Sequence, residues 1–195
     1  MDQNEKCNAV DAANASLTRG GGVEEKLELH GIFTVECIGA DGEVKWTDTI
    51  ENTVVTVGKN LALDTFLAGS AYTVVGPFMG LISLASFSAI NVADTMASHA
   101  GWLEAGATNA PTYTAPRKTA AWSAASGGSK ALSSALSFAI TGTGTVKGAF
   151  LVYGSGAVNT IDSTAGVLYS AGLFTGGDRA VINGDTLNVS YTASL

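Results

Sequence analysis

Five glycines in the stretch TGTGTVKGAFLVYGSG, residues 141–156, come nearest in this sequence to a chemical motif. Glycine-rich loops bind phosphate when they open a helix, because backbone N–H groups then point at the anion. Gly142 and Gly144 match the first two glycines of a dinucleotide fingerprint, but Lys147 stands where the third is required. The next residues are aromatic and β-branched, which favours a strand. The glycines therefore predict strand ends and turns, and no phosphate site.

Nucleophilic catalysis would depend on the two histidines, His30 and His99. Ser98 precedes His99 directly, and Asp94 is close in sequence. Adjacent residues on a helix do not face each other, so a nucleophile–base pair is not expected there. His30 alternates with apolar residues, which indicates the solvated face of a strand. The sequence contains no G-x-S-x-G elbow. We predict no catalytic residue and no enzymatic activity.

Metal binding has equally little support. The two histidines are not at ligand spacing, and Cys7 and Cys37, the only cysteines, have no metal spacing either. Asp178 and Asp185 in GGDRAVINGD could touch a calcium ion, but aspartates of this kind are far more common as turn residues. We predict no metal and no cofactor.

Carbohydrate binding would need exposed aromatic side chains, and the candidates are Trp46, Trp102 and Trp122. Trp46 alternates with the apolar face of a predicted strand and is expected in the core. The sequence leaves the positions of Trp102 and Trp122 open.

The charge of the chain is concentrated near its beginning. Residues 1–51 hold 11 acidic and 4 basic side chains, whereas residues 52–195 hold six of each. Charged residues make up 14% of the sequence, against about 25% in ordinary domains. Neutral surfaces associate, which predicts a homo-oligomer, with a trimer favoured. Arg117 and Lys118 are the only basic pair beyond the first quarter, so nucleic acid is not an expected partner.

The first elements are read from periodicity. Alternating polar and apolar residues on both sides of Asp41-Gly42 predict a β-hairpin over about residues 27–51. A short strand is expected at 53–57 and a helix at 58–69. A brief second helix is expected at 93–99, with Asp94 as its cap.

Beyond residue 111 the pattern is strand and turn. The long uncharged stretch 65–93 is interrupted by glycines and polar residues, so we interpret it as buried strands and not as a membrane span. The prediction is a mainly β fold, a β-sandwich or jelly-roll-like single domain over residues 27–195 with one or two short helices. Later strands are expected at 117–125, 130–141, 145–154, 166–174 and 185–195.

Residues 1–26 are expected to form an extended N-terminal arm, flexible by itself or ordered by a partner. They are polar and rich in Asn and Ala, with too little apolar content for a core. The start lacks the basic and apolar regions of a secretory signal, and the sparse cysteines fit a reducing compartment.

Four segments resemble virion structural proteins of tailed bacteriophages in their order along the chain. They are NTVVTVGKNLALDTFLAG, VADTMASH, ALSFAITGTGTVKGAFLVYG and NGDTLNVSYTASL, which together sample residues 50–195. The resemblance implies a non-enzymatic, β-rich protein of the particle, and it carries over no catalytic residue.

The expected function is that of a head decoration (cement) protein, which binds between capsid subunits and stabilises the shell. The expected partners are the major capsid protein or other virion proteins, and the location is the virion, assembled in the host cytoplasm. A tail, collar or fibre-anchor protein is the alternative, and a carbohydrate-binding module is a third.

Overall fold

The structure is a computed structural model that describes residues 29–67 and 75–195. This part of the chain is mainly β with a single α-helix, which confirms the predicted fold class at that level. The predicted arm, residues 1–26, lies outside the described residues. The elements are β1 (His30–Ile38), β2 (Val44–Val54), α1 (Thr56–Leu67), β3 (Phe78–Ser83), β4 (Glu104–Ala105), β5 (Lys118–Thr119), β6 (Ser129–Ala131), β7 (Leu136–Ala139), β8 (Gly144–Tyr153), β9 (Val167–Phe174), β10 (Arg179–Val181) and β11 (Thr186–Ser194).

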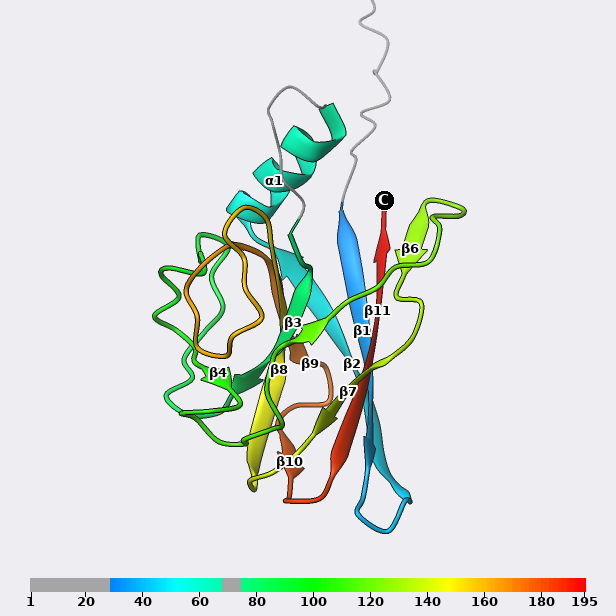
Figure 1. Cartoon of the computed structure of the whole chain (residues 1–195), viewed down its shortest axis with the longest axis vertical. Helices are drawn as coiled ribbons and strands as arrows, with labels where there is room; N and C mark the ends of the chain where they lie inside the picture. The colour runs from blue at the N-terminus through cyan, green and yellow to red at the C-terminus, as the bar shows by residue number, and fades with distance from the viewer. Residues whose placement is uncertain (1–28, 68–74) are drawn as a thin grey trace, which may run out of the picture.

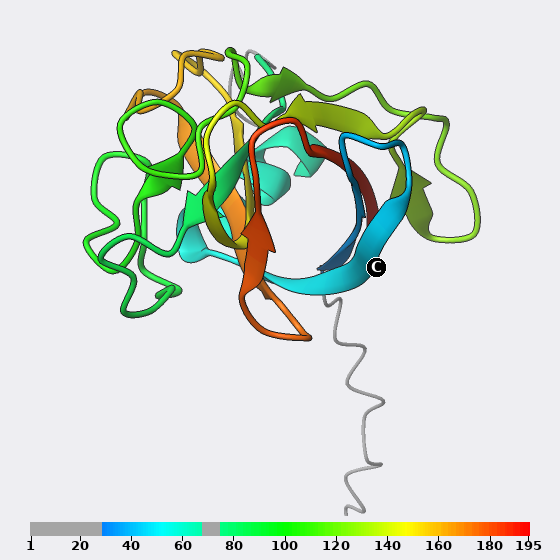
Figure 2. The same ribbon diagram turned by 90° about the horizontal axis from the view of Figure 1, so that it is seen from below.

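The described strands form one open antiparallel sheet (Figure 1). Its main path runs β4-β3-β8-β9-β2-β1-β11-β6, while β5 pairs with β3, β7 with β11, and β10 with β8. The view from below in Figure 2 shows that the sheet curls round an interior. Residues 111–141 cross between its two sides, since β5 pairs with β3 and β7 pairs with β11. An isolated bridge between Tyr113 and Ile140, outside both strands, joins the two ends of this segment.

The first two strands form the predicted hairpin. They pair from Ile32 with Glu51 to Ile38 with Val44. Gly42 has a φ of 85°, which a side chain would strain, and the Asp41 carboxylate accepts a 3.1 Å hydrogen bond from the Glu43 amide. The Asp41-Gly42 pair thus forms the turn as predicted, because glycine accepts the positive φ angle that the turn requires.

The helix is where the sequence predicts one, but it begins earlier. Thr56 is already helical, so the expected strand at 53–57 is wrong beyond Val54, where β2 ends. Gly58 lies against the carbonyl of Tyr169, and a side chain there would collide with it. The absence of a side chain at Gly58 therefore lets the first turn of α1 pack directly against β9. Its expected end at Gly69 lies outside the described residues.

The second expected helix, at 93–99, does not form. These residues make turns, closed by the bridge between Thr95 and Ser98. The Asp94 carboxylate instead accepts hydrogen bonds from the Asn91 amide at 2.9 Å and from the Trp102 indole at 3.0 Å. The stretch 65–93 also contributes only one described strand, β3, where several were expected.

The later strands follow the prediction more closely. Segments 145–154, 166–174 and 185–195 become β8, β9 and β11, while the segments 117–125 and 130–141 are divided into shorter pieces. β4 and β10 were not predicted, because both are short and lie among turn residues.

Two hydrophobic cores lie on opposite faces of the sheet. The inner core fills the curl and includes Phe33, Ile50, Leu151 and Val189. The outer core lies on β3, β8 and β9 and includes Ile82, Trp102, Phe150 and Ala171. Loop residues 84–103 and 154–166, here called the loop layer, supply Met96, Trp102 and Ala157 to the outer core.

Candidate functional site

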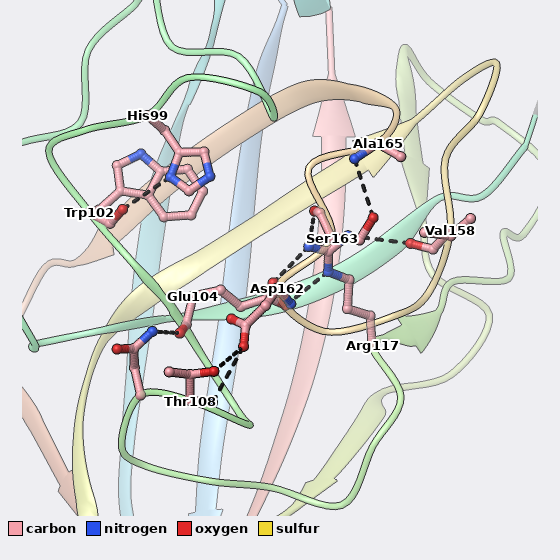
Figure 3. A network of polar contacts seen from close by, with 10 residues as sticks. His99, Trp102, Glu104, Thr108, Arg117, Val158, Asp162, Ser163 and Ala165 are labelled. Carbon is pink, nitrogen blue, oxygen red and sulfur yellow. Dashed lines mark hydrogen bonds and ion pairs between the residues drawn. The ribbon is translucent and has the colours of Figure 1, made fainter.

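An ion pair with both side chains buried lies beneath the loop layer (Figure 3). Arg117, next to β5, donates from Nε to Glu104 Oε1 at 2.8 Å and from Nη2 to Glu104 Oε2 at 2.6 Å. The two side chains are 0% and 4% exposed. A two-point contact of this kind fixes the relative orientation of both groups.

The same pair ties down the loop of residues 157–166. Arg117 donates to the carbonyls of Ser163 at 2.7 Å and Val158 at 3.3 Å, and the Asp162 amide donates to Glu104 at 2.8 Å. Asp162 in turn accepts a 2.7 Å hydrogen bond from the Thr108 hydroxyl. Burial raises the pKa of Glu104, against the opposing effects of Arg117 and the Asp162 amide. All these groups are hydrogen-bonded to one another, so the ion pair has a structural role and holds the loop of residues 157–166 in place.

His99 and Trp102 stack with ring centroids 4.0 Å apart. The His99 Nδ1 atom is 3.0 Å from the Trp102 carbonyl, and the Trp102 indole donates to Asp94. Ser98 is engaged elsewhere, with its amide donating to Thr95. The structure thus gives His99 a packing partner in Trp102, and it gives Ser98 no hydrogen bond to His99.

A second buried carboxylate lies at the hairpin end of the sheet. Asp185 Oδ2 accepts from Lys45 at 2.7 Å and from the Ile182 amide at 2.9 Å, and Cys37 Sγ is 3.8 Å away. Burial raises the pKa of Asp185, but the hydrogen bonds from Lys45 and Ile182 outweigh it, and the net pKa is lowered. Burial also raises the pKa of the Cys37 thiol to about 11.

Asp48 anchors the turn after β9. It accepts from Arg179 Nε at 2.7 Å, from the Thr49 amide at 2.7 Å and from the Thr175 hydroxyl at 3.0 Å. Burial raises its pKa, but these hydrogen bonds outweigh that effect, and the net pKa is lowered. The Arg179 guanidinium also lies over the Trp46 ring, 5.5 Å from its centroid.

The predicted calcium candidates have separate partners. Asp185 is held by Lys45, while Asp178 pairs with Lys147. Within residues 29–67 and 75–195, no group of three or more His, Cys, Asp or Glu side chains could hold a metal ion. The stretch 141–156 contains strand β8, as predicted.

The three tryptophans differ in exposure. Trp102 is fully buried, and Trp46 and Trp122 are half-buried against the inner core. Trp102 is therefore not a platform for a sugar, and the expectation that Trp46 joins the core holds in part.

Among the described residues, those that cover the outer face of the sheet lie over one half of it. The loop layer covers β3, β8 and β9, whereas β2, β1 and β11 expose a surface rich in Ser and Thr. This surface, here called the hydroxyl face, consists of His30, Ile32, Thr34, Thr47, Thr49, Glu51, Thr53, Ser190 and Thr192. Ser190, Thr34 and Thr49 are register partners and form one hydroxyl row across the strands.

A groove of about 450 Å³ marks the border between the loop layer and the hydroxyl face. Its walls are Phe87–Ile90 of the loop layer and Glu51 and Thr53 of β2, and its floor is Ala171–Leu173 of β9. Ala171 pairs with Thr53 and Leu173 with Glu51, so the groove lies on the outer face of the sheet. The groove is mainly apolar, with one carboxylate at its edge.

Sequence reasoning missed the ion pair and the hydroxyl face. In the sequence Arg117 is a basic neighbour of Lys118, and its partner Glu104 lies 13 residues away with no local pattern to link the two. The hydroxyl face could be anticipated strand by strand, but the order of β11, β1 and β2 that joins it could not.

No helix in the described ranges combines the length and apolarity that a membrane crossing requires.

Comparisons with known proteins add no identification. No protein-family model matches this chain, and comparisons with curated proteins and with solved structures likewise give no match.

Proposed function

We propose that this chain is a non-enzymatic structural protein of a tailed-bacteriophage virion, and specifically a head decoration protein that binds between capsid subunits. Its partners are then the major capsid protein and further copies of itself, with a trimer favoured. Its location is the virion, after assembly in the host cytoplasm. The sandwich or jelly-roll type of the curled sheet is part of this proposal.

The proposal rests on the observation that charged side chains of the described body pair with one another. Within residues 29–67 and 75–195, ion pairs join Lys45 to Asp185, Arg117 to Glu104, Lys147 to Asp178 and Arg179 to Asp48. These charged side chains pair with one another, and the hydroxyl face carries mainly hydroxyl groups. Such surfaces suit contacts with other proteins better than binding to nucleic acid.

The resemblance of four sequence segments to virion proteins supports the same class. It does not distinguish the head from the tail, so a tail, collar or fibre-anchor protein remains the second candidate. The carbohydrate-binding module loses one of its three candidate aromatics, because Trp102 is buried.

The test is the number of copies per particle. Particles of the phage that encodes the chain are purified, and the chain is quantified by mass spectrometry against the major capsid protein. On the order of hundreds of copies, as a symmetric shell requires, supports head decoration. A few dozen copies or fewer supports the tail or fibre role. Absence of the chain from purified particles contradicts both.

A further inference from the structure

We propose that residues 1–19 of this chain bind the hydroxyl face of the same molecule, with their apolar side chains in the groove beside it. The sequence predicts an arm that orders only against a partner surface, and the body itself offers such a surface. This inference concerns the free protein and does not rest on the proposed function.

The first argument is the place where the N-terminal segment joins the body. β1 begins at His30, and Ile32 pairs directly with Glu51, which lines the groove. Neighbouring strands lie about 4.8 Å apart. The chain that precedes β1 therefore joins the described body within one or two strand spacings of the groove.

The second argument is length. A nine-residue strand such as β1 spans about 30 Å, which sets the length of the hydroxyl face. Nineteen extended residues reach about 65 Å at most, roughly twice that length. Gly20, Gly21 and Gly22, followed by residues 23–28, connect residues 1–19 to the described body, and glycine accepts the positive φ angles that a chain reversal requires.

The third argument is chemical fit. The hydroxyl face offers hydrogen-bonding groups and the Glu51 carboxylate, and the groove offers Phe87, Ile90 and Leu173. The segment supplies matching groups of three kinds. They are the polar side chains Gln3, Asn4, Asn8, Asn14, Ser16 and Thr18, the cations Lys6 and Arg19, and the apolar side chains Val10 and Leu17. The segment also carries Asp2, Glu5 and Asp11, so the fit rests on hydrogen bonds and apolar contacts and not on its net charge.

A second copy fits the same surface less well. A symmetric face-to-face contact would bring two Glu51 carboxylates to one interface. Three strands of this length present about 400 Å², roughly half of the 800 Å² that each partner of a standard interface buries. A tethered segment, in contrast, acts at an effective concentration in the millimolar range.

The two cysteines allow a test on the full-length protein. Cys37 is buried and burial raises its pKa, so a thiol-reactive nitroxide label is directed to Cys7 in the segment. The expected result is selective broadening of the amide NMR signals of Thr34, Thr49 and Ser190 on the hydroxyl face. Reduction of the nitroxide should restore these signals.

Paired variants test the surface itself. Ile32→Asp combined with Thr53→Asp should abolish the broadening, because it removes an apolar contact and adds two carboxylates opposite a segment whose acidic side chains outnumber its basic ones. Val44→Asp, on an exposed residue of β2 outside the face, should leave the broadening unchanged. Preserved chemical shifts in the cores show that each variant is folded.

Mixing identifies the source of the segment. Isotope-labelled protein without nitroxide, mixed with nitroxide-bearing protein at natural abundance, should show no broadening. Broadening in this mixture would mean that the segment binds another copy, and it would overturn the proposal. Absent or unselective broadening in the singly labelled protein would overturn it as well.

Discussion

Arg117 and Glu104 depend on each other because both are removed from water. Replacing Arg117 by Met leaves the Glu104 carboxylate buried without a counter-charge, so we expect a loss of about 3–5 kcal/mol in the free energy of unfolding. Urea denaturation followed by circular dichroism measures this loss. Adding Glu104→Gln to Arg117→Met should recover part of it, because the remaining buried group is then neutral.

The control is the pair of Lys147 and Asp178, whose side chains are 18% and 42% exposed. Lys147→Met should lower the free energy of unfolding by only about 0–1 kcal/mol, because an exposed pair is screened by solvent. Equal losses for Arg117→Met and Lys147→Met would contradict the structural role of the buried pair.

Asp48 and Asp185 make the protein sensitive to acid. Both have a pKa that is lowered from the ordinary value of 3.8. Their contribution to stability is therefore complete above that value and is lost as the pH falls below it towards the folded-state pKa. We expect Asp48→Asn and Asp185→Asn to reduce stability at neutral pH and to flatten its decline between about pH 4 and pH 2. Urea midpoints measured across this range provide the check, and an unchanged decline in both variants would refute it.

Single residues also show the limits of sequence reasoning. Asp94 has the right type and position for a helix cap, but its carboxylate is used by the Trp102 indole. Ser98 and His99 are neighbours in sequence, yet His99 stacks on Trp102. In both cases the partner is Trp102, which is near in sequence, but the turns that bring the side chains together show no periodicity from which the contact could be predicted.

At the scale of elements, β8 separates the two cores. Ala149 and Leu151 point into the inner core, and Phe150 and Val152 point into the outer core. Gly148 lies in the same strand, and a side chain there would collide with the carbonyl oxygen of Gly172 in β9. That oxygen belongs to the backbone, so it cannot move without separating the two strands.

We therefore expect Gly148→Ala to destabilise the protein by about 1–3 kcal/mol or more, in the range of overpacked cores. Thermal unfolding monitored by calorimetry measures the effect. Ser137→Ala, on the exposed side of β7, is the matched control and should change stability little. A Gly148→Ala protein as stable as this control would show that the close approach of β8 and β9 is not required.

The elements that sequence reasoning predicted are those with strong local patterns. The β1–β2 hairpin combines alternation with an Asp-Gly turn, and β8, β9 and β11 are long apolar or alternating runs between turns. β4 and β10 are too short to show a period, and they become strands only because β3 and β8 offer them partners. Thr56 and Val57 favour a strand locally, but the close contact of Gly58 with β9 places them in the helix.

At the scale of the whole molecule, the shared strands couple the two cores. β3, β8 and β9 each contribute side chains to both cores. If these strands separate, both cores lose packing at the same time. We expect the described body to unfold in one cooperative transition. Trp102 reports on the outer core, and Trp46 and Trp122 report on the inner core.

The measurement compares tryptophan fluorescence of the wild type and of Trp102→Phe with far-UV circular dichroism during urea unfolding. Coincident midpoints for fluorescence and circular dichroism within each protein are expected for a two-state transition. An early fluorescence change that disappears in Trp102→Phe would mean that the loop layer detaches before the sheet unfolds.

The pairing of β1 with β11 has a consequence for the topology of the backbone. His30 and Ser194 are register partners, so the first and last strands of the body begin and end side by side (Figure 1). A short peptide could join these points into a circle, and a new opening in the Gly39–Glu43 turn would leave every strand ladder intact. The architecture is therefore compatible with circular permutation. A cargo fused after Leu195 would therefore emerge beside the start of β1 at His30.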